Sequence, residues 1–166
     1  MSAPQVGVDH FGVGTDGRRR AFGDETALGH HHHPVARAFY EIAAKIYGYE
    51  PVKAPLAEMK VELKIIKDLI DEKTRLIFLN NPNNPTGTIF EDQAFKSFLN
   101  DLPPDILVVI DEAYAEFVES KAFPHSLSYI DDYPVVILRT FSKAYGLAGL
   151  RIGYGIGEES IISFLE

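Results

Sequence analysis

The chain has 166 residues, 46% of them hydrophobic and 24% charged, with a net charge of −8 at pH 7 and no cysteine. These values are typical of a globular domain with its own hydrophobic core. The negative charge argues against a nucleic-acid partner, which needs clustered Lys and Arg. The absence of cysteine excludes disulfides and thiolate metal sites and fits the cytoplasmic location that we expect. No apolar run approaches the roughly 20 residues of a membrane helix, and the first thirty residues lack the apolar core of a secretory signal.

Residues 1–33 show no sustained period of two or of 3.6 residues, so we predict an irregular or poorly structured segment there. This segment contains many glycines, an RRR run and four consecutive histidines, His30 to His33. A contiguous run of histidines cannot set tetrahedral metal geometry by itself, so we interpret it as a linker or tag remnant. From Pro34 onward the patterns become regular, and we predict a domain over 34–166.

The regular part begins with apolar residues at helical spacing over 39–47, which predict an amphipathic helix that ends near Gly48. A short strand is predicted at 52–56 and a second helix at 63–70. The continuous apolar run RLIFL at 75–79 predicts a strand. It leads into NNPNNPTG, whose Asn, Pro and Gly residues are typical of turns.

A capping box at Thr88 and Glu91 predicts the start of a third helix. Further apolar strands are predicted at 106–110 and 135–138, another strand at 151–157, and the start of a helix at 158–166. Because these strands are apolar throughout instead of alternating, they are expected to be buried on both faces. The sequence therefore predicts the α/β class, with a mostly parallel sheet flanked by helices.

Polar side chains follow three of the predicted strands. Ligands of open α/β sheets bind beyond the carboxyl ends of the strands, so these side chains are expected to form one site. The first strand is followed by an asparagine-rich loop, the second by an acidic pair and a tyrosine, and the third by an arginine, two hydroxyls and a lysine. In chain order they are Asn80, Asn81, Asn83 and Asn84; Asp111, Glu112 and Tyr114; and Arg139, Thr140, Ser142 and Lys143.

One reading of the acidic pair Asp111–Glu112 is the magnesium site of an ATPase. That reading needs a phosphate-binding loop, and the nearest match, GVGTDGRR, has Arg18 where lysine belongs and Arg19 where a hydroxyl belongs. The same stretch matches G-x-G-x-x-G, a weak signal when alone, and Arg37 stands where a dinucleotide site needs an acid. Both nucleotide readings are therefore disfavoured.

A cofactor that bonds to lysine explains these strand ends better. Lys143 lies among small and apolar residues, and burial there would favour the neutral amine that attacks an aldehyde. The hydroxyls of Thr140 and Ser142 and the guanidinium of Arg151 could hold a phosphate, and Asp111 could keep a pyridine nitrogen protonated. These are the groups that pyridoxal 5'-phosphate requires.

The stretches NNPNNPTG (80–87), DEAYAEF (111–117) and RTFSKAYGLAGLRIGY (139–154) together resemble the fold-type-I pyridoxal-phosphate aminotransferases of class I/II. Within these, they look most like the histidinol-phosphate aminotransferases, and the resemblance covers residues from about 39 to 166. It implies that 34–166 is part of the cofactor-binding large domain. It also implies that the family's N-terminal arm and its small C-terminal domain are absent from this sequence.

The resemblance also implies roles for individual residues. Lys143 would bond covalently to the cofactor and later carry a proton, and Asp111 would pair with the pyridine nitrogen. Tyr114 and Asn84 would bind the ring hydroxyl, whereas Arg37 stands where the family places an aromatic residue that stacks on the ring. The implied phosphate ligands are Ser142 and Arg151, with Thr140 and the upstream Gly14, Thr15 and Asp16 as weaker candidates.

The activity implied by the resemblance is ping-pong amino transfer between histidinol phosphate and 2-oxoglutarate in histidine biosynthesis. The family works as a homodimer on small amino-acid or amino-alcohol phosphates and 2-oxo acids, and no metal is implied. Three alternatives stay open: another class I/II aminotransferase, a relative of threonine-phosphate decarboxylase, or a non-catalytic fragment that retains part of the cofactor site.

Overall fold

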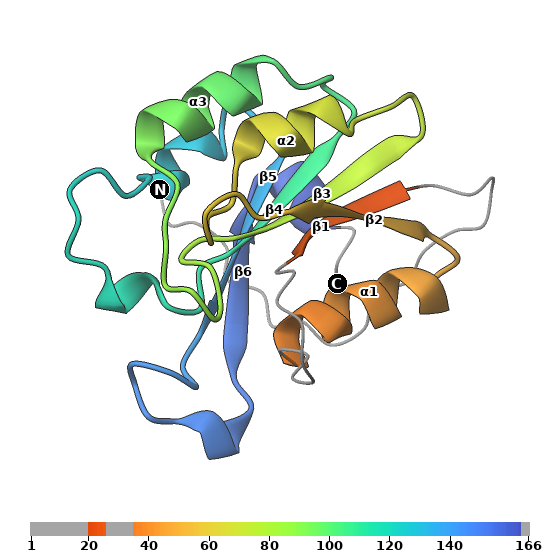
Figure 1. The fold of residues 1–166 in the computed structure, drawn as a ribbon. Helices are drawn as coiled ribbons and strands as arrows, with labels where there is room; N and C mark the ends of the chain where they lie inside the picture. The colour runs from red at the N-terminus through yellow and green to blue at the C-terminus, as the bar shows by residue number, and fades with distance from the viewer. Residues whose placement is uncertain (1–19, 26–34, 164–166) are drawn as a thin grey trace.

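The computed structural model describes residues 20–25 and 35–163, which form one sheet with helices on both faces (Figure 1). The elements, in chain order, are β1 (Arg20–Glu25), α1 (Val35–Ile46), β2 (Glu50–Pro55), α2 (Leu63–Asp68), β3 (Thr74–Asn80), α3 (Asp92–Asn100), β4 (Leu107–Asp111), β5 (Val135–Thr140), β6 (Gly153–Gly157) and α4 (Glu159–Ile162). Short 3₁₀ helices lie at η1 (Ala115–Phe117), η2 (Ser126–Tyr129) and η3 (Ala148–Leu150).

The sheet has six strands in the order β2-β1-β3-β4-β5-β6. All neighbouring pairs are parallel except β5 and β6, which run antiparallel. The predicted α/β class with a mostly parallel sheet is therefore confirmed. The antiparallel edge strand was not foreseen, because the direction of a strand leaves no mark on its own sequence.

Strand β1 corrects the prediction that residues 1–33 are irregular throughout. Residues 20–25 form a strand that pairs with β2 on one side and with β3 on the other. A strand between two neighbours is held by backbone hydrogen bonds on both sides, so it can form without an apolar period. The rest of 1–33, including the histidine run, lies outside the described residues.

The alternation of side chains along the strands divides the core between the two faces of the sheet. The larger cluster, on the face covered by α2 and α3, includes Ile77, Ile110 and Ile137, which have no exposed area, and Phe95 of α3. The smaller cluster, on the opposite face, centres on Val109, Val136 and Ile162. Residues one position apart at a strand end therefore face different environments, which decides which of them share a site.

The start of α3 is not the capping box that the sequence predicts. The helix begins at Asp92 after Glu91, and no side-chain cap hydrogen bond is present. The hydroxyl of Thr88 donates instead to the carbonyl of Met59 at 3.0 Å. Asp92 Oδ1 accepts hydrogen bonds from the phenol of Tyr129 (2.8 Å) and from the backbone N–H of His125 (3.2 Å). The side chains at the start of α3 therefore bond to distant segments and not to the first turn of the helix.

Glu41 of helix α1 makes two ion pairs, one of which joins the helix to β2. Its carboxylate accepts Lys45 at 2.5 Å within the helix and Lys53 of β2 at 2.9 Å. The two ammonium groups lower the pKa of Glu41 from 4.5 to about 2. The ion pair with Lys53 therefore links α1 to the edge strand β2.

Replacing Glu41 with glutamine is expected to lower the free energy of unfolding by roughly 0.5 kcal/mol at neutral pH, the usual size for a screened surface ion pair. Because the folded pKa is depressed, the contribution is complete above pH 4.5 and is lost as the pH falls toward 2. Urea unfolding of both proteins between pH 7 and 3 measures this difference. The exposed Glu119→Gln is the control, and a gap that widens with acid would contradict the assignment.

Candidate functional site

The carboxyl ends of β3, β4 and β5 meet at one edge of the sheet, as the sequence predicts. Asn80 pairs in register with Asp111, and Asp111 pairs with Leu138. Just beyond them, the N–H of Asn81 donates to the carbonyl of Asp111 at 3.1 Å, and the N–H of Glu112 donates to the carbonyl of Leu138 at 2.9 Å. The polar segments that follow the three strands therefore start side by side.

The carboxylate of Asp111 is held by donors at both of its oxygens. Oδ1 accepts the N–H of Ala113 at 3.0 Å, and Oδ2 accepts the phenol of Tyr40 at 2.5 Å. The ring of Tyr40 stacks on Phe78 with centroids 4.5 Å apart. Sequence reasoning missed Tyr40, since its only signal was an aromatic residue near the place where the family's stacking residue is expected.

Lys143 lies close to Tyr114, the residue one turn after Asp111. The Nζ atom is 5.1 Å from the centroid of the Tyr114 ring, within the range of a cation–π contact. The burial of Lys143 that the sequence suggested is not found, because its side chain is exposed. The loop after β4 and the loop after β5 thus bring the tyrosine and the lysine together.

The loop that carries Lys143 is closed by its own hydrogen bonds. The N–H of Phe141 donates to the carbonyl of Ile152 at 3.2 Å, and the hydroxyl of Thr140 donates to the same carbonyl at 3.3 Å. The hydroxyl oxygen of Thr140 also accepts the N–H of Ser142 at 3.1 Å. Thr140 is therefore engaged within the loop, whereas the side chain of Ser142 is left half-buried near the sheet edge.

Arg151 lies at the far end of this loop in the left-handed conformation, with φ of 52°. Its Nη1 donates to the carbonyl of Ala148 at 3.1 Å, and its side chain is exposed. The loop projects from the body of the molecule at the bottom of Figure 1. The structure thus places Arg151 in the same loop as Ser142 and Lys143, with its guanidinium bonded inside that loop.

In the asparagine-rich loop after β3, two asparagine side chains stabilise the turn and a third is available to bind a ligand. The side chain of Asn81 exchanges hydrogen bonds with the backbone of Phe90, at 3.1 and 3.4 Å, and Asn83 donates to Thr86 at 2.7 Å. Asn84 is partly exposed, and its side chain makes no hydrogen bond within 20–25 and 35–163. Asn81 and Asn83 therefore act as turn formers, as the sequence predicts, and Asn84 is left free to meet a ligand.

Glu112 points to the opposite face of the sheet from Asp111. It has 1% of its surface exposed, and its Oε2 accepts Nε and Nη2 of Arg139 at 3.0 and 2.8 Å. Burial alone would lower the pKa of Arg139, but the hydrogen bond and charge of Glu112 raise it above its ordinary value. Arg139 and Glu112 therefore form a structural salt bridge. The geometry argues against a magnesium site shared by Asp111 and Glu112.

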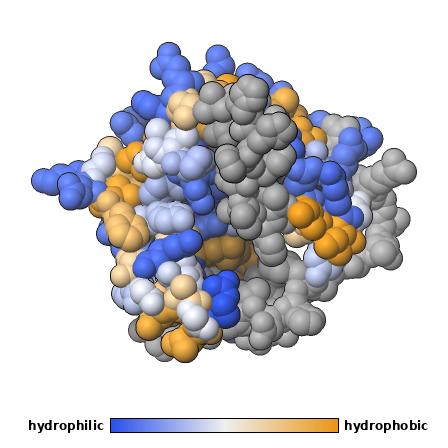
Figure 2. All heavy atoms as spheres, turned by 60° about the horizontal axis from the view of Figure 1, so that its bottom comes forward, coloured by the Kyte–Doolittle hydropathy of each residue, from blue (hydrophilic) through white to orange (hydrophobic). Residues whose placement is uncertain are grey.

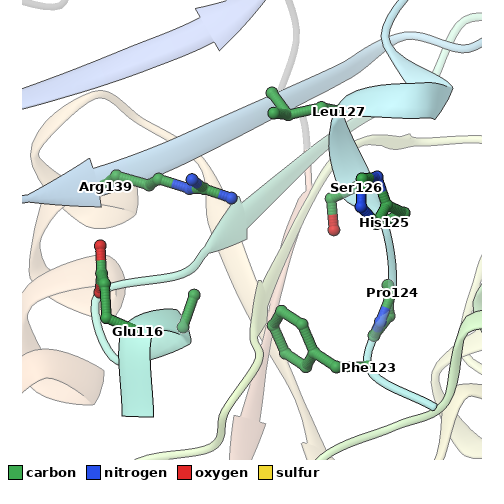
Figure 3. A pocket seen from close by; sticks show the side chains of 8 residues that line it. Glu116, Phe123, Pro124, His125, Ser126, Leu127 and Arg139 are labelled. Carbon is green, nitrogen blue, oxygen red and sulfur yellow. The ribbon is translucent and has the colours of Figure 1, made fainter. Parts of the chain in front are cut away.

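A hollow of about 240 Å³ lies on the face of the sheet to which Glu112 points, between β5, η1 and η2 (Figure 3). The guanidinium of Arg139 and the hydroxyl of Ser126 point into it above the ring of Phe123. The hydroxyl of Ser126 is buried and has no partner among the described residues. The hollow contains none of the side chains predicted to bind the cofactor, so it is separate from the edge that carries Asp111 and Lys143.

The surface around the Lys143 loop mixes apolar and charged side chains, and Figure 2 shows the face on which this end of the molecule comes forward. Tyr145, Leu147, Leu150 and Ile152 are all more than 40% exposed.

None of the helices in the described ranges has the length and apolar character that crossing a bilayer requires. Those same ranges hold no group of three His, Cys, Asp or Glu side chains placed to bind a metal ion.

The described groups fit a pyridoxal phosphate molecule at its ring end. A carboxylate fixed at the end of β4, an exposed amine beside a phenol, and a free amide are the donors and acceptors that such a ring needs. The two residues predicted for the phosphate end, Ser142 and Arg151, lie in the loop after β5. The upstream candidates Gly14, Thr15 and Asp16 lie outside the described residues.

Comparison with known proteins agrees with this geometry. Residues 36–166 match the family model described as aminotransferase class I and II. The chain is 47% identical over 129 residues to a histidinol-phosphate aminotransferase of Moorella thermoacetica, covering 76% of this chain and 33% of that protein. It is 45% identical over 127 residues to an aromatic amino acid aminotransferase of Mycobacteroides abscessus, covering 76% and 36%.

Among solved structures, the chain resembles the histidinol-phosphate aminotransferase of Sinorhizobium meliloti in complex with pyridoxal-5'-phosphate. The TM-score is 0.67 at 35% sequence identity, covering 84% of this chain and 36% of that one. The chain therefore spans about a third of the length of the relatives it matches.

Proposed function

Because this chain belongs to the aminotransferase class I and II family, we propose that it carries part of the cofactor-binding site of a pyridoxal-phosphate-dependent transaminase. The observation that supports the proposal is the contact between Lys143 and the Tyr114 ring, in loops that follow β5 and β4, beside the carboxyl end of β4 that carries Asp111. A relative of known structure was solved with pyridoxal-5'-phosphate, which supports the choice of cofactor. When bound, this cofactor withdraws electrons from the substrate carbon that carries the amino group.

In this proposal each residue of the site has its own chemical role. Lys143 supplies the amine that attaches the cofactor and then moves a proton at the substrate carbon. Asp111 keeps the ring nitrogen protonated through a charge-assisted hydrogen bond. Tyr114 and Asn84 hold the ring hydroxyl. Ser142 and Arg151 bind the phosphate, once Arg151 exchanges its bond to the Ala148 carbonyl for the anion.

We propose reversible amino transfer between histidinol phosphate and 2-oxoglutarate, in histidine biosynthesis. The support is the similarity to histidinol-phosphate aminotransferases at 47% and 35% identity. The aromatic amino acid aminotransferase at 45% makes an aromatic amino acid the second candidate donor. In the same proposal the whole protein acts as a cytoplasmic homodimer, which the molar mass from light scattering would test.

Glutamate production from 2-oxoglutarate tests the activity directly. The purified chain, loaded with pyridoxal phosphate, is incubated with histidinol phosphate or with phenylalanine, and glutamate is measured against time. A faster rate with histidinol phosphate supports the first donor, and a faster rate with phenylalanine supports the second. Cofactor binding without glutamate from either donor would favour the non-catalytic fragment and contradict the transaminase activity of this chain.

A further inference from the structure

Tyr40 links helix α1 to the carboxylate on which the proposed cofactor site depends. Its phenol donates to Asp111 Oδ2 at 2.5 Å, across 71 positions of sequence. Its ring stacks on Phe78, with centroids 4.5 Å apart and planes inclined by 22°. Phe78 lies on β3 and pairs in register with Val109, two residues before Asp111. Tyr40 is thus held on one side by an aromatic contact and on the other by a short hydrogen bond to a charged group.

Two donors from different elements define the orientation of the carboxylate. The N–H of Ala113 at 3.0 Å takes Oδ1, and the phenol of Tyr40 takes Oδ2. The terminal torsion of an aspartate is broad, so a carboxylate with one donor can rotate about its last bond. With a donor at each oxygen, the plane of the carboxylate is set. Each oxygen still has a second lone pair for a ligand.

Resting on the proposed function, we propose that Tyr40 is a positioning residue for the cofactor ring. Its hydroxyl holds Asp111 in the orientation in which Oδ2 accepts the protonated ring nitrogen of pyridoxal phosphate. The ring nitrogen and the phenol then share the carboxylate, because an ionised carboxylate offers about four acceptor sites. Without the phenol the Asp111 carboxylate rotates freely. Part of the free energy of cofactor binding is then lost in ordering that carboxylate.

The variant Tyr40→Phe tests this, because it keeps the ring on Phe78 and removes only the hydroxyl. Affinity is measured by spectral titration for pyridoxal phosphate and for the analogue in which a carbon replaces the ring nitrogen. The variant is expected to bind pyridoxal phosphate about tenfold more weakly, the effect of roughly one hydrogen bond to a charged group. It is expected to bind the analogue as the wild type does, since that ligand has no ring N–H for Asp111.

The control is Tyr133→Phe, which removes a phenol hydrogen bond of similar length, 2.6 Å to Asn100 at the end of α3. It is expected to leave both affinities unchanged. In an Asp111→Ala background, Tyr40→Phe is expected to have no further effect on cofactor affinity, because the group that Tyr40 positions is gone. That non-additivity separates positioning from a general effect on the fold.

Several results would overturn the proposal for Tyr40. Equal loss of affinity for both ligands would mean a structural role, and tighter binding by Tyr40→Phe would mean that the phenol occupies the place of the ring nitrogen. An unchanged affinity for pyridoxal phosphate would also refute it, while leaving the cofactor site itself intact. If the wild-type chain bound no pyridoxal phosphate, the proposed function would fail as well, and the titration of the wild type identifies that case.

Discussion

Replacing Lys143 with alanine is expected to abolish the covalent attachment of pyridoxal phosphate to this chain. The amine is the only group at this position that can form the carbon–nitrogen bond with the cofactor's aldehyde, so the effect is all or none. Its exposure and its place 5.1 Å from the Tyr114 ring leave it accessible to a ligand on the sheet edge. The measurement is intact mass after incubation with the cofactor and reduction with borohydride.

The matched control is Lys96→Ala, which removes another exposed lysine, on helix α3, far from the loop after β5 in Figure 1. This variant is expected to gain the mass of one reduced cofactor, as the wild type does. Peptide mapping then locates the modified lysine. Modification that persists in Lys143→Ala, or that is spread over surface lysines in the wild type, would show that the chain has no specific cofactor lysine.

Replacing Arg139 with alanine is expected to destabilise the fold by about 3 kcal/mol, because removing one partner of a buried ion pair leaves an uncompensated charge in the core. Glu112 would keep its place at 1% exposure without the guanidinium that binds its Oε2. The other oxygen, Oε1, already has no partner among the described residues. Urea unfolding, followed by circular dichroism at pH 7, measures the loss in the free energy of unfolding.

A double variant distinguishes burial of a lone charge from loss of a useful contact. Glu112→Leu combined with Arg139→Met removes both charges and keeps apolar volume, so it is expected to be close to the wild type in stability or slightly above it. Arg139→Ala and the double variant should therefore differ by several kcal/mol. If both lost the same stability, packing around Arg139 would be the main contribution, and the ion-pair explanation would be wrong.

Much of the fold could be predicted from local patterns. The apolar runs at 75–79, 106–110 and 135–138 became β3, β4 and β5 with boundaries shifted by one or two residues. Buried strands carry a continuous apolar signal because both faces of the sheet are covered, and that signal does not depend on the rest of the chain. The adjacency of their carboxyl ends followed from the parallel topology that the same signal implies.

Other features depended on pairing between distant segments. Strand β1 has no periodic signal of its own and exists because β2 and β3 satisfy its backbone on both sides. The predicted cap at Thr88 was wrong because Met59 offered that hydroxyl a partner from another loop. Lys143 was expected to be buried from its apolar neighbours in sequence, yet those neighbours project with it into an exposed loop.

The sequence by itself determined the class of the fold, the family, and the strand ends at which Asp111 and Lys143 stand. Those properties reside in short contiguous stretches, where side-chain period and residue type act locally. Only the tertiary structure decided that Asp111 meets Tyr40 while Glu112 meets Arg139 on the other face. Two adjacent carboxylates look alike in sequence, and they are distinguished by the alternation of a strand and by whichever distant donors reach each face of the sheet.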